Sequence, residues 1–299
     1  MISSRFQKFV ENFVFTCLSK IRILFVSDIF ITRRKPVIIN SKEAVILGNG
    51  PSLNKSIDNN PASLNNKDLV CVNFFPETAY YQQLKPRYYI TGAPELWIDD
   101  VTNEWKSARN KLFTTIKDKT DWELIFLIPT LARGKKEWQN ILSANRNIKI
   151  TYYNITAIEG YKWFRHMCFK AGLGVPRPHN VITPALVIML NYGYRDIYLL
   201  GADHSWLPDI MVDHENRVYT LHKHFYDKDT ANPVIMKNLN MGDRKLHEVL
   251  HKFYHTFAGY FIIREYALSL KANIYNATPD SFIDAFERRD FEKPESVEQ

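Results

Sequence analysis

The sequence of 299 residues lacks any uncharged apolar run close to the ~20 residues that an α-helix needs to cross a bilayer. It therefore predicts no membrane-spanning helix. The apolar stretches near the N-terminus are interrupted, and no small-residue cleavage site follows them, which argues against a cleavable signal peptide. Cysteine is scarce as well. Cys17, Cys71 and Cys168 are scattered and lack the spacing of a metal site, which favours a reduced, cytosolic setting.

Glycine is also sparse, with 11 residues, yet two of them stand together in Gly48-Asn-Gly-Pro-Ser-Leu53. This segment follows the apolar run 44–47, so it predicts a buried strand that enters a tight turn. Glycine allows a ligand to approach the main chain closely, and the N-terminus of a following helix suits a phosphate. The segment is not G-x-G-x-x-G, since Leu53 stands at the third glycine position, and it is not a P-loop.

Short apolar segments alternate with helical segments along the rest of the chain. This alternation predicts an α/β fold, a Rossmann-like and mainly parallel sheet with helices on both faces. In such sheets ligands bind beyond the carboxyl ends of the strands. Strands are expected at 44–47, 69–73, 86–91, 124–129, 148–152, 196–201 and, as the last one, 272–275, with helices at 181–192 and 254–270.

Four regions follow from this pattern. Residues 1–36 form a basic amphipathic helix, 37–203 the nucleotide-binding core, 204–253 a polar lid insertion, and 254–299 the last helix, last strand and tail. The net charge of +7 and the interleaved apolar and basic residues of the first region predict a peripheral position on the anionic inner membrane. Packing of that helix on its own domain, or on another subunit of a homo-oligomer, stays open.

Several segments together resemble the glycosyltransferase family 42 sialyltransferases. They are 48–53, Val70-Cys-Val-Asn73, Ile182-Thr183, 192–203 and Tyr275-Asn-Ala-Thr-Pro-Asp-Ser281. The resemblance implies a CMP-sugar donor, usually CMP-sialic acid. The same Gly-Pro-Ser-Leu and Gly-x-Asp pair also occurs in relatives, namely flagellin-modifying motility-associated factors and hydroxymethylpterin pyrophosphokinases. The pair is therefore typical of a superfamily more than of one reaction.

The resemblance also implies roles for single residues. His255 would be the catalytic base, because a histidine pKa lies near the working pH. Leaving CMP carries one phosphate, so hydroxyl groups can stabilise it, and neither a metal nor another cofactor is expected. The residues implied to bind the nucleotide or the donor are Asn49, Gly50, Ser52, Asn73, Thr183, Gly201, Asp203, Tyr219 and Tyr226.

Two departures from the family pattern concern the donor side. The family's Arg-Ile-Thr-Ser-Gly is replaced by Val-Ile-Thr-Pro-Ala185, which follows Asn180, so its arginine is absent. Thr91-Gly-Ala93 stands where an asparagine is expected after the third strand. Both changes bear on the identity of the sugar, and a different sugar nucleotide stays open.

Rival motifs are weaker. His247-Glu-Val-Leu-His251 matches the zinc-protease pattern, but the third ligand of that class is missing; an incidental zinc site that adds His255 stays open. Asp227-Lys-Asp229 is a D-x-D inside the polar insertion, where a solvated charge pair is the better interpretation. The basic and aromatic segment 161–165 reads as one helix face, and the sequence indicates no nucleic-acid partner.

The sequence thus predicts an inverting glycosyltransferase. It would transfer sialic acid or a related nonulosonic acid from a CMP-sugar to a cell-surface glycan or glycolipid, such as a lipopolysaccharide or capsule precursor. Three alternatives stay open: a transferase for another sugar nucleotide, a pterin pyrophosphokinase-like enzyme that needs ATP and magnesium, and a non-catalytic nucleotide-binding subunit of a glycan assembly.

Overall fold

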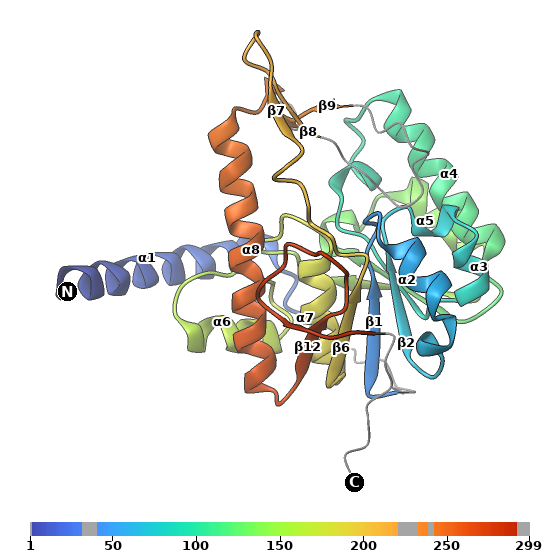
Figure 1. Ribbon diagram of the computed structural model, residues 1–299, viewed down its shortest axis with the longest axis horizontal. Helices are drawn as coiled ribbons and strands as arrows, with labels where there is room; N and C mark the ends of the chain where they lie inside the picture. Colours follow the sequence, from blue (N-terminus) through green and yellow to red (C-terminus); the bar gives the residue numbers. More distant parts are fainter. Residues whose placement is uncertain (1, 32–40, 221–232, 239–241, 292–299) are drawn as a thin grey trace.

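A computed structural model describes residues 2–31, 41–220, 233–238 and 242–291. Its centre is an eight-stranded sheet of order β13-β12-β6-β1-β2-β3-β4-β5, in which neighbouring strands pair in parallel. The α/β fold expected from the sequence is therefore confirmed (Figure 1). The strands are β1 Glu43–Leu47, β2 Asp68–Val72, β3 Tyr88–Ile90, β4 Leu124–Pro129, β5 Ile148–Tyr153, β6 Asp196–Leu200, β12 Asn273–Asn276 and β13 Glu287–Arg288.

Helices cover both faces of this sheet. Alternate residues of β1 point to opposite sides: Ala44 and Ile46 join one hydrophobic cluster, whereas Val45 and Leu47 join the other. Such strands are apolar throughout because neither face meets water. The helices are α1 Ile2–Val26, α2 Leu53–Asn59, α3 Tyr80–Leu84, α4 Asn103–Lys119, α5 Lys136–Ser143, α6 Lys162–Lys170, α7 Ile182–Tyr192 and α8 Leu246–Ser269, with short 3₁₀ turns η1 Pro61–Leu64, η2 Phe75–Glu77, η3 Pro94–Leu96 and η4 Thr130–Ala132.

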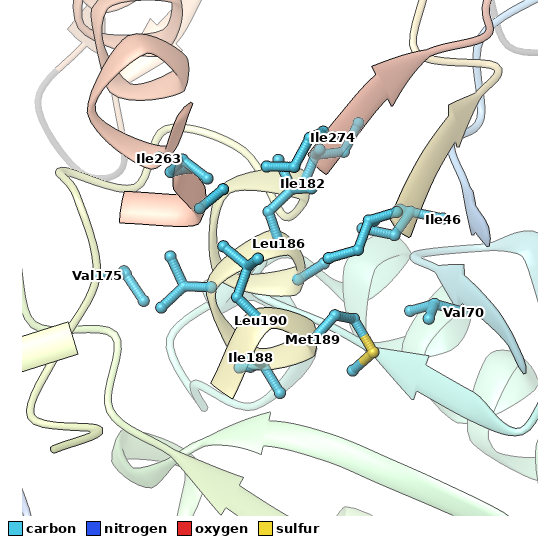
Figure 2. Packing of buried hydrophobic residues seen from close by; sticks show 14 of the residues in the cluster. Ile46, Val70, Val175, Ile182, Leu186, Ile188, Met189, Leu190, Ile263 and Ile274 are labelled. Carbon is cyan, nitrogen blue, oxygen red and sulfur yellow. The ribbon is translucent and has the colours of Figure 1, made fainter. Parts of the chain in front are cut away.

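α7 is the centre of the first cluster. Its residues from Ile182 to Leu190 are all buried, which agrees with an expected helix that is apolar almost all round. Figure 2 shows Leu186 and Leu190 of α7 among apolar side chains from β1, β2, α8 and β12. The helix ends at Gly193, whose φ of 106° is the left-handed conformation that a helix C-cap requires.

Two expected elements are corrected by the structure. The long helix begins at Leu246 rather than at 254, because the Lys245 N–H donates to the Glu248 carboxylate at 2.7 Å and this bond caps an earlier helix start. The strand at 273–276 is not the last one, since β13 pairs beside it at the edge of the sheet. β13 has only two residues, too few for an alternating pattern to be visible in the sequence.

The polar insertion carries small sheets of its own. β7 Ile210–Val212, β8 Val218–Thr220 and β9 Val234–Ile235 pair antiparallel, and β10 Lys237–Asn238 pairs with β11 Gly242–Asp243. Val218 and Met236 pack against Val249 and Phe253 of α8, so the insertion is seated on the start of that helix. Its role as a lid stays a prediction, as do the four regional boundaries.

Within the described ranges, no helix combines the length and the apolarity needed to cross a bilayer.

The packing around α7 generates a stability prediction. Leu186→Ala should lower the free energy of unfolding by ~2–5 kcal/mol, because Leu186 is fully buried and its removal leaves a cavity. Leu131→Ala is the matched control: Leu131 is 52% exposed, so its loss should change stability by less than ~0.5 kcal/mol. Urea denaturation of both variants measures this, and equal losses would contradict a core centred on α7.

Candidate functional site

The loops that follow β1 and β6 lie against each other at one end of the sheet. β1 and β6 are neighbours, and the chain leaves β1 toward β2 on its other side, so this is a topological switch point, where open α/β sheets bind ligands. The Gly48 N–H donates to Leu200 O at 2.7 Å, and the Gly50 N–H donates to Gly201 O at 2.8 Å. These two bonds fix the glycine-containing turn expected from the sequence to the loop after β6.

Asp203 is the side chain that locks the two loops together. Its carboxylate accepts the Ser52 N–H at 3.2 Å and the Ser52 hydroxyl at 2.9 Å. Burial raises the pKa of Asp203 above its ordinary value, while the bonds from Ser52 act in the opposite direction. A Cβ built on Gly50 would lie 1.9 Å from Asp203 Oδ2, so glycine is required here for the approach of this carboxylate.

This arrangement bears on the expected phosphate site. α2 has seven residues, and the N–H of Ser52 at its start is bonded to Asp203. Gly201, with φ of 65°, is equally constrained, because a Cβ there would lie 2.8 Å from Leu53 Cβ. In this structure Ser52 and Asp203 are hydrogen-bonded to each other, and Gly201 lies against Leu53. These contacts fix the shape of the loop that carries Asn49.

Asn49 and Asn73 carry buried acceptors that make no hydrogen bond. Asn49 Nδ2 donates to Val72 O at 3.2 Å, which places its amide beside Asn73 at the end of β2. The Oδ1 atoms of both residues are buried without a partner. Asn73 also has a φ of 49°, a left-handed conformation that few residues other than glycine and asparagine adopt. An unsatisfied buried acceptor costs ~1–3 kcal/mol, so each of these two oxygens would gain from a hydrogen-bond donor placed beside it.

A second, buried polar network lies at the start of α7. Asn180 Oδ1 accepts the Thr183 N–H at 3.0 Å, and Asn180 Nδ2 donates to the Tyr260 hydroxyl at 2.9 Å. The same hydroxyl is 2.6 Å from His204 Nε2. Burial lowers the pKa of His204 to about 3, so its ring is neutral. Thr183 is buried as well, and its contacts hold the helix start in place.

His255 lies on the same side of the molecule as this network. Its Nε2 is 3.0 Å from His251 Nε2, and its ring stacks on that of His179 with centroids 5.7 Å apart. Burial lowers the pKa of His255, and the charges of Arg177 and His251 lower it further. His179 has a buried Nε2 without a hydrogen bond, and burial is the first cause that lowers its pKa to about 4. Neutral rings of this kind can accept a proton.

The structure places the expected site residues in two sets of contacts, which meet in the chain at Asp203 and His204. His255 stacks on His179, and the next residue, Asn180, shares the network of Tyr260 and His204. Asp203 bonds Ser52, and Asn49 of the same loop bonds Val72 O, next to Asn73. The sequence missed Asn180 and Tyr260, since neither stands at a strand end. His204 adjoins an expected residue, and its position after a strand was the one available signal.

One expected residue, Tyr219, lies apart from these contacts, and another is not described. The Tyr219 hydroxyl, on β8, bonds Asp213 Oδ2 at 3.1 Å, and Arg217 lies over its ring. Tyr226 lies outside the described residues, as does the D-x-D segment 227–229. Within the part of the chain that the structure describes, no group of three or more histidine, cysteine, aspartate or glutamate side chains is arranged to hold a metal.

Comparison with known structures supports the architecture. The chain is similar to the MAf glycosyltransferase from Magnetospirillum magneticum AMB-1, with a TM-score of 0.50 and 12% sequence identity over 87% of this chain. It covers 35% of the length of that protein. At this identity the likeness establishes a shared fold. No protein-family model matches the chain, and a search of curated proteins finds no match.

The contact between Gly50 and Asp203 generates a prediction with opposite signs at two glycines. Gly50→Ala should destabilise the protein by ~1–3 kcal/mol, because the new methyl group overlaps the carboxylate. Gly259→Ala, inside α8, should stabilise it by ~0.5–1 kcal/mol, because its Cβ would meet only Pro176 Cβ at 3.9 Å and alanine favours a helix.

Thermal and urea denaturation of both variants measure these shifts. Gly50 does not have a positive φ, so a loss at this position reports the close approach of the loop after β6, through Asp203 and the Gly201 carbonyl, and not the backbone angle. A Gly50→Ala variant as stable as the wild type would show that the loop after β6 is free to move away.

Proposed function

We propose that this protein is an inverting glycosyltransferase that uses a CMP-linked sialic acid or related nonulosonic acid, with a cell-surface glycan or glycolipid as acceptor. The observation that carries the proposal is the pair of unpartnered amide oxygens of Asn49 and Asn73 at the switch point. Such acceptors suit a ligand rich in hydrogen-bond donors, as a nucleoside is through its ribose hydroxyls and the amino group of cytosine.

The chemistry assigned to the site needs one base and one stabilised leaving group. The acceptor hydroxyl attacks the anomeric carbon of the sugar while neutral His255 takes its proton. The bond from the anomeric carbon to the phosphate oxygen breaks, and CMP leaves with the electron pair. Inversion follows because the attack comes from the face opposite to the leaving group. Family resemblance in the segment 48–53 supports CMP as this leaving group, and the shared fold of a glycosyltransferase is compatible with it.

A nucleotide panel tests the donor class first. CMP should raise the melting temperature in the presence of EDTA, because a ligand at 100 times its Kd adds ~2.7 kcal/mol of stability. CDP, UDP, GDP and ATP are measured alongside, each with magnesium and with EDTA. Stabilisation by ATP or a nucleoside diphosphate with magnesium alone would overturn the proposal, in favour of a pyrophosphokinase or of another sugar nucleotide.

A matched pair of asparagine variants ties that shift to the site. Asn73→Ala removes one unpartnered acceptor and should weaken CMP binding ~10-fold, as expected for the loss of ~1–1.5 kcal/mol of hydrogen bonding. Asn140→Ala, on the exposed side of α5, should leave the affinity unchanged. Isothermal titration of both variants provides the numbers, and equal affinities would place the nucleotide elsewhere.

The pH dependence of transfer tests His255. His255→Ala should abolish turnover and leave CMP binding intact. Since the pKa of His255 lies below its ordinary value of 6.5, the wild-type rate should fall only on the acid side of that value. His251 is one cause of the lowering, so His251→Ala should raise the pKa of His255 and move the acid limb of kcat/KM to higher pH.

His214→Ala is the control for that profile. His214 is exposed within the insertion, so its loss should leave the acid limb where the wild type has it. Full turnover of His255→Ala would assign the base to another residue.

A further inference from the structure

α1 meets the rest of the protein through polar residues. The Ser19 hydroxyl donates to Glu159 O at 3.1 Å and accepts the Glu159 N–H at 2.8 Å. Thr16 Oγ1 accepts the Tyr161 N–H at 3.1 Å, and Arg22 pairs with the Glu159 carboxylate at 2.7 Å. Thr16 and Ser19 are buried, and α1 meets its own domain mainly through polar residues, with Ile23 as an apolar contact to the core.

Most of the large apolar residues of α1 are exposed, and several of them lie on the opposite side of the helix. Val10, Val14, Ile21 and Phe25 recur at helical spacing and lie on the side of the helix opposite to Thr16 and Ser19. Leu24 is 80% exposed and Phe25 is 85% exposed, which inverts the usual arrangement of a helix that packs on its domain. The other exposed apolar residues between 6 and 30 are Phe6, Phe9, Phe13, Phe15, Leu18, Val26, Ile29 and Phe30.

The charges of α1 favour an anionic partner. The described helix carries Arg5, Lys8, Lys20 and Arg22 against the single acid Glu11. Arg22 is paired with Glu159, which leaves Arg5, Lys8 and Lys20 to be attracted by an anionic lipid surface. The arc of apolar residues is also wider than the narrow seam of a coiled coil. Both features distinguish an interfacial helix from a dimerisation helix.

We propose that α1 binds an anionic lipid bilayer, lying in the headgroup region with Val10, Val14, Ile21, Leu24 and Phe25 turned toward the acyl chains. The helix of 25 residues would be about 37 Å long, and Figure 1 shows it projecting from one side of the molecule, where it is accessible. Its polar face stays bonded to 156–161, so the membrane contact does not require the domain to open. This proposal is independent of the proposed donor and reaction.

Vesicle flotation of the full chain tests the proposal. The protein should float with phosphatidylcholine vesicles that contain phosphatidylglycerol, more weakly with phosphatidylcholine alone, and less at high salt because exposed charges are screened. Phe25→Glu should reduce the fraction bound by roughly 10-fold. Leu131→Glu, at an exposed apolar residue on η4 outside α1, is the control and should bind as the wild type does. Lys20→Gln should weaken binding about 5-fold.

Cys17 gives a second readout without a new cysteine. It lies within α1 and is partly exposed, whereas Cys71 and Cys168 are buried, so an environment-sensitive dye should label it selectively in the folded protein. Its emission should shift to the blue when anionic vesicles are added. A wild type that neither floats nor shifts overturns the proposal. A dimer in solution that Phe25→Glu dissociates also overturns it, and assigns the same face to a second copy.

Discussion

The contact between the loops after β1 and β6 is the constraint on which the site depends. Asp203 reaches across to the Ser52 N–H and hydroxyl, and Gly50 leaves the space for its carboxylate. Because this carboxylate is buried, each bond it accepts counts for more than it would in water. The loop held in this way places Asn49 over the end of β2, where its amide oxygen and that of Asn73 stay unsatisfied. The hydrogen bonds between Asp203 and Ser52 thus hold the loop in which the amide oxygen of Asn49 has no partner.

The sequence was sufficient to predict the sheet, because parallel strands that are buried on both faces appear in the sequence as short apolar runs. β4 at 124–129 coincides with its prediction, and α7 differs from its own by one residue. The failures have local causes. The two-residue β13 is below the length at which any period is visible, and the start of α8 depends on the hydrogen bond from the Lys245 N–H to Glu248, a polar residue outside the apolar pattern.

For the site, sequence reasoning located strand ends and missed what lies behind them. Asn49, Asn73 and Asp203 were identifiable because polar residues that follow buried strands gather at one edge of the sheet. Asn180 and Tyr260 come from a loop and from the middle of α8, and only the folded chain brings them to His204. The reverse also occurred: Ser52 and Gly201 matched a nucleotide motif, yet their immediate partners are protein groups.

Glu159 gives α1 a second consequence. Its carboxylate is shared by Arg22 of α1 and by Arg177, at 2.7 Å from each, and Arg177 lowers the pKa of His255 while Glu159 raises it. If Arg22 is withdrawn, the whole negative charge of Glu159 is left to offset Arg177, and the proton affinity of His255 rises. The charge balance at Glu159 therefore links α1, more than a hundred residues away in sequence, to the proton affinity of the His255 imidazole.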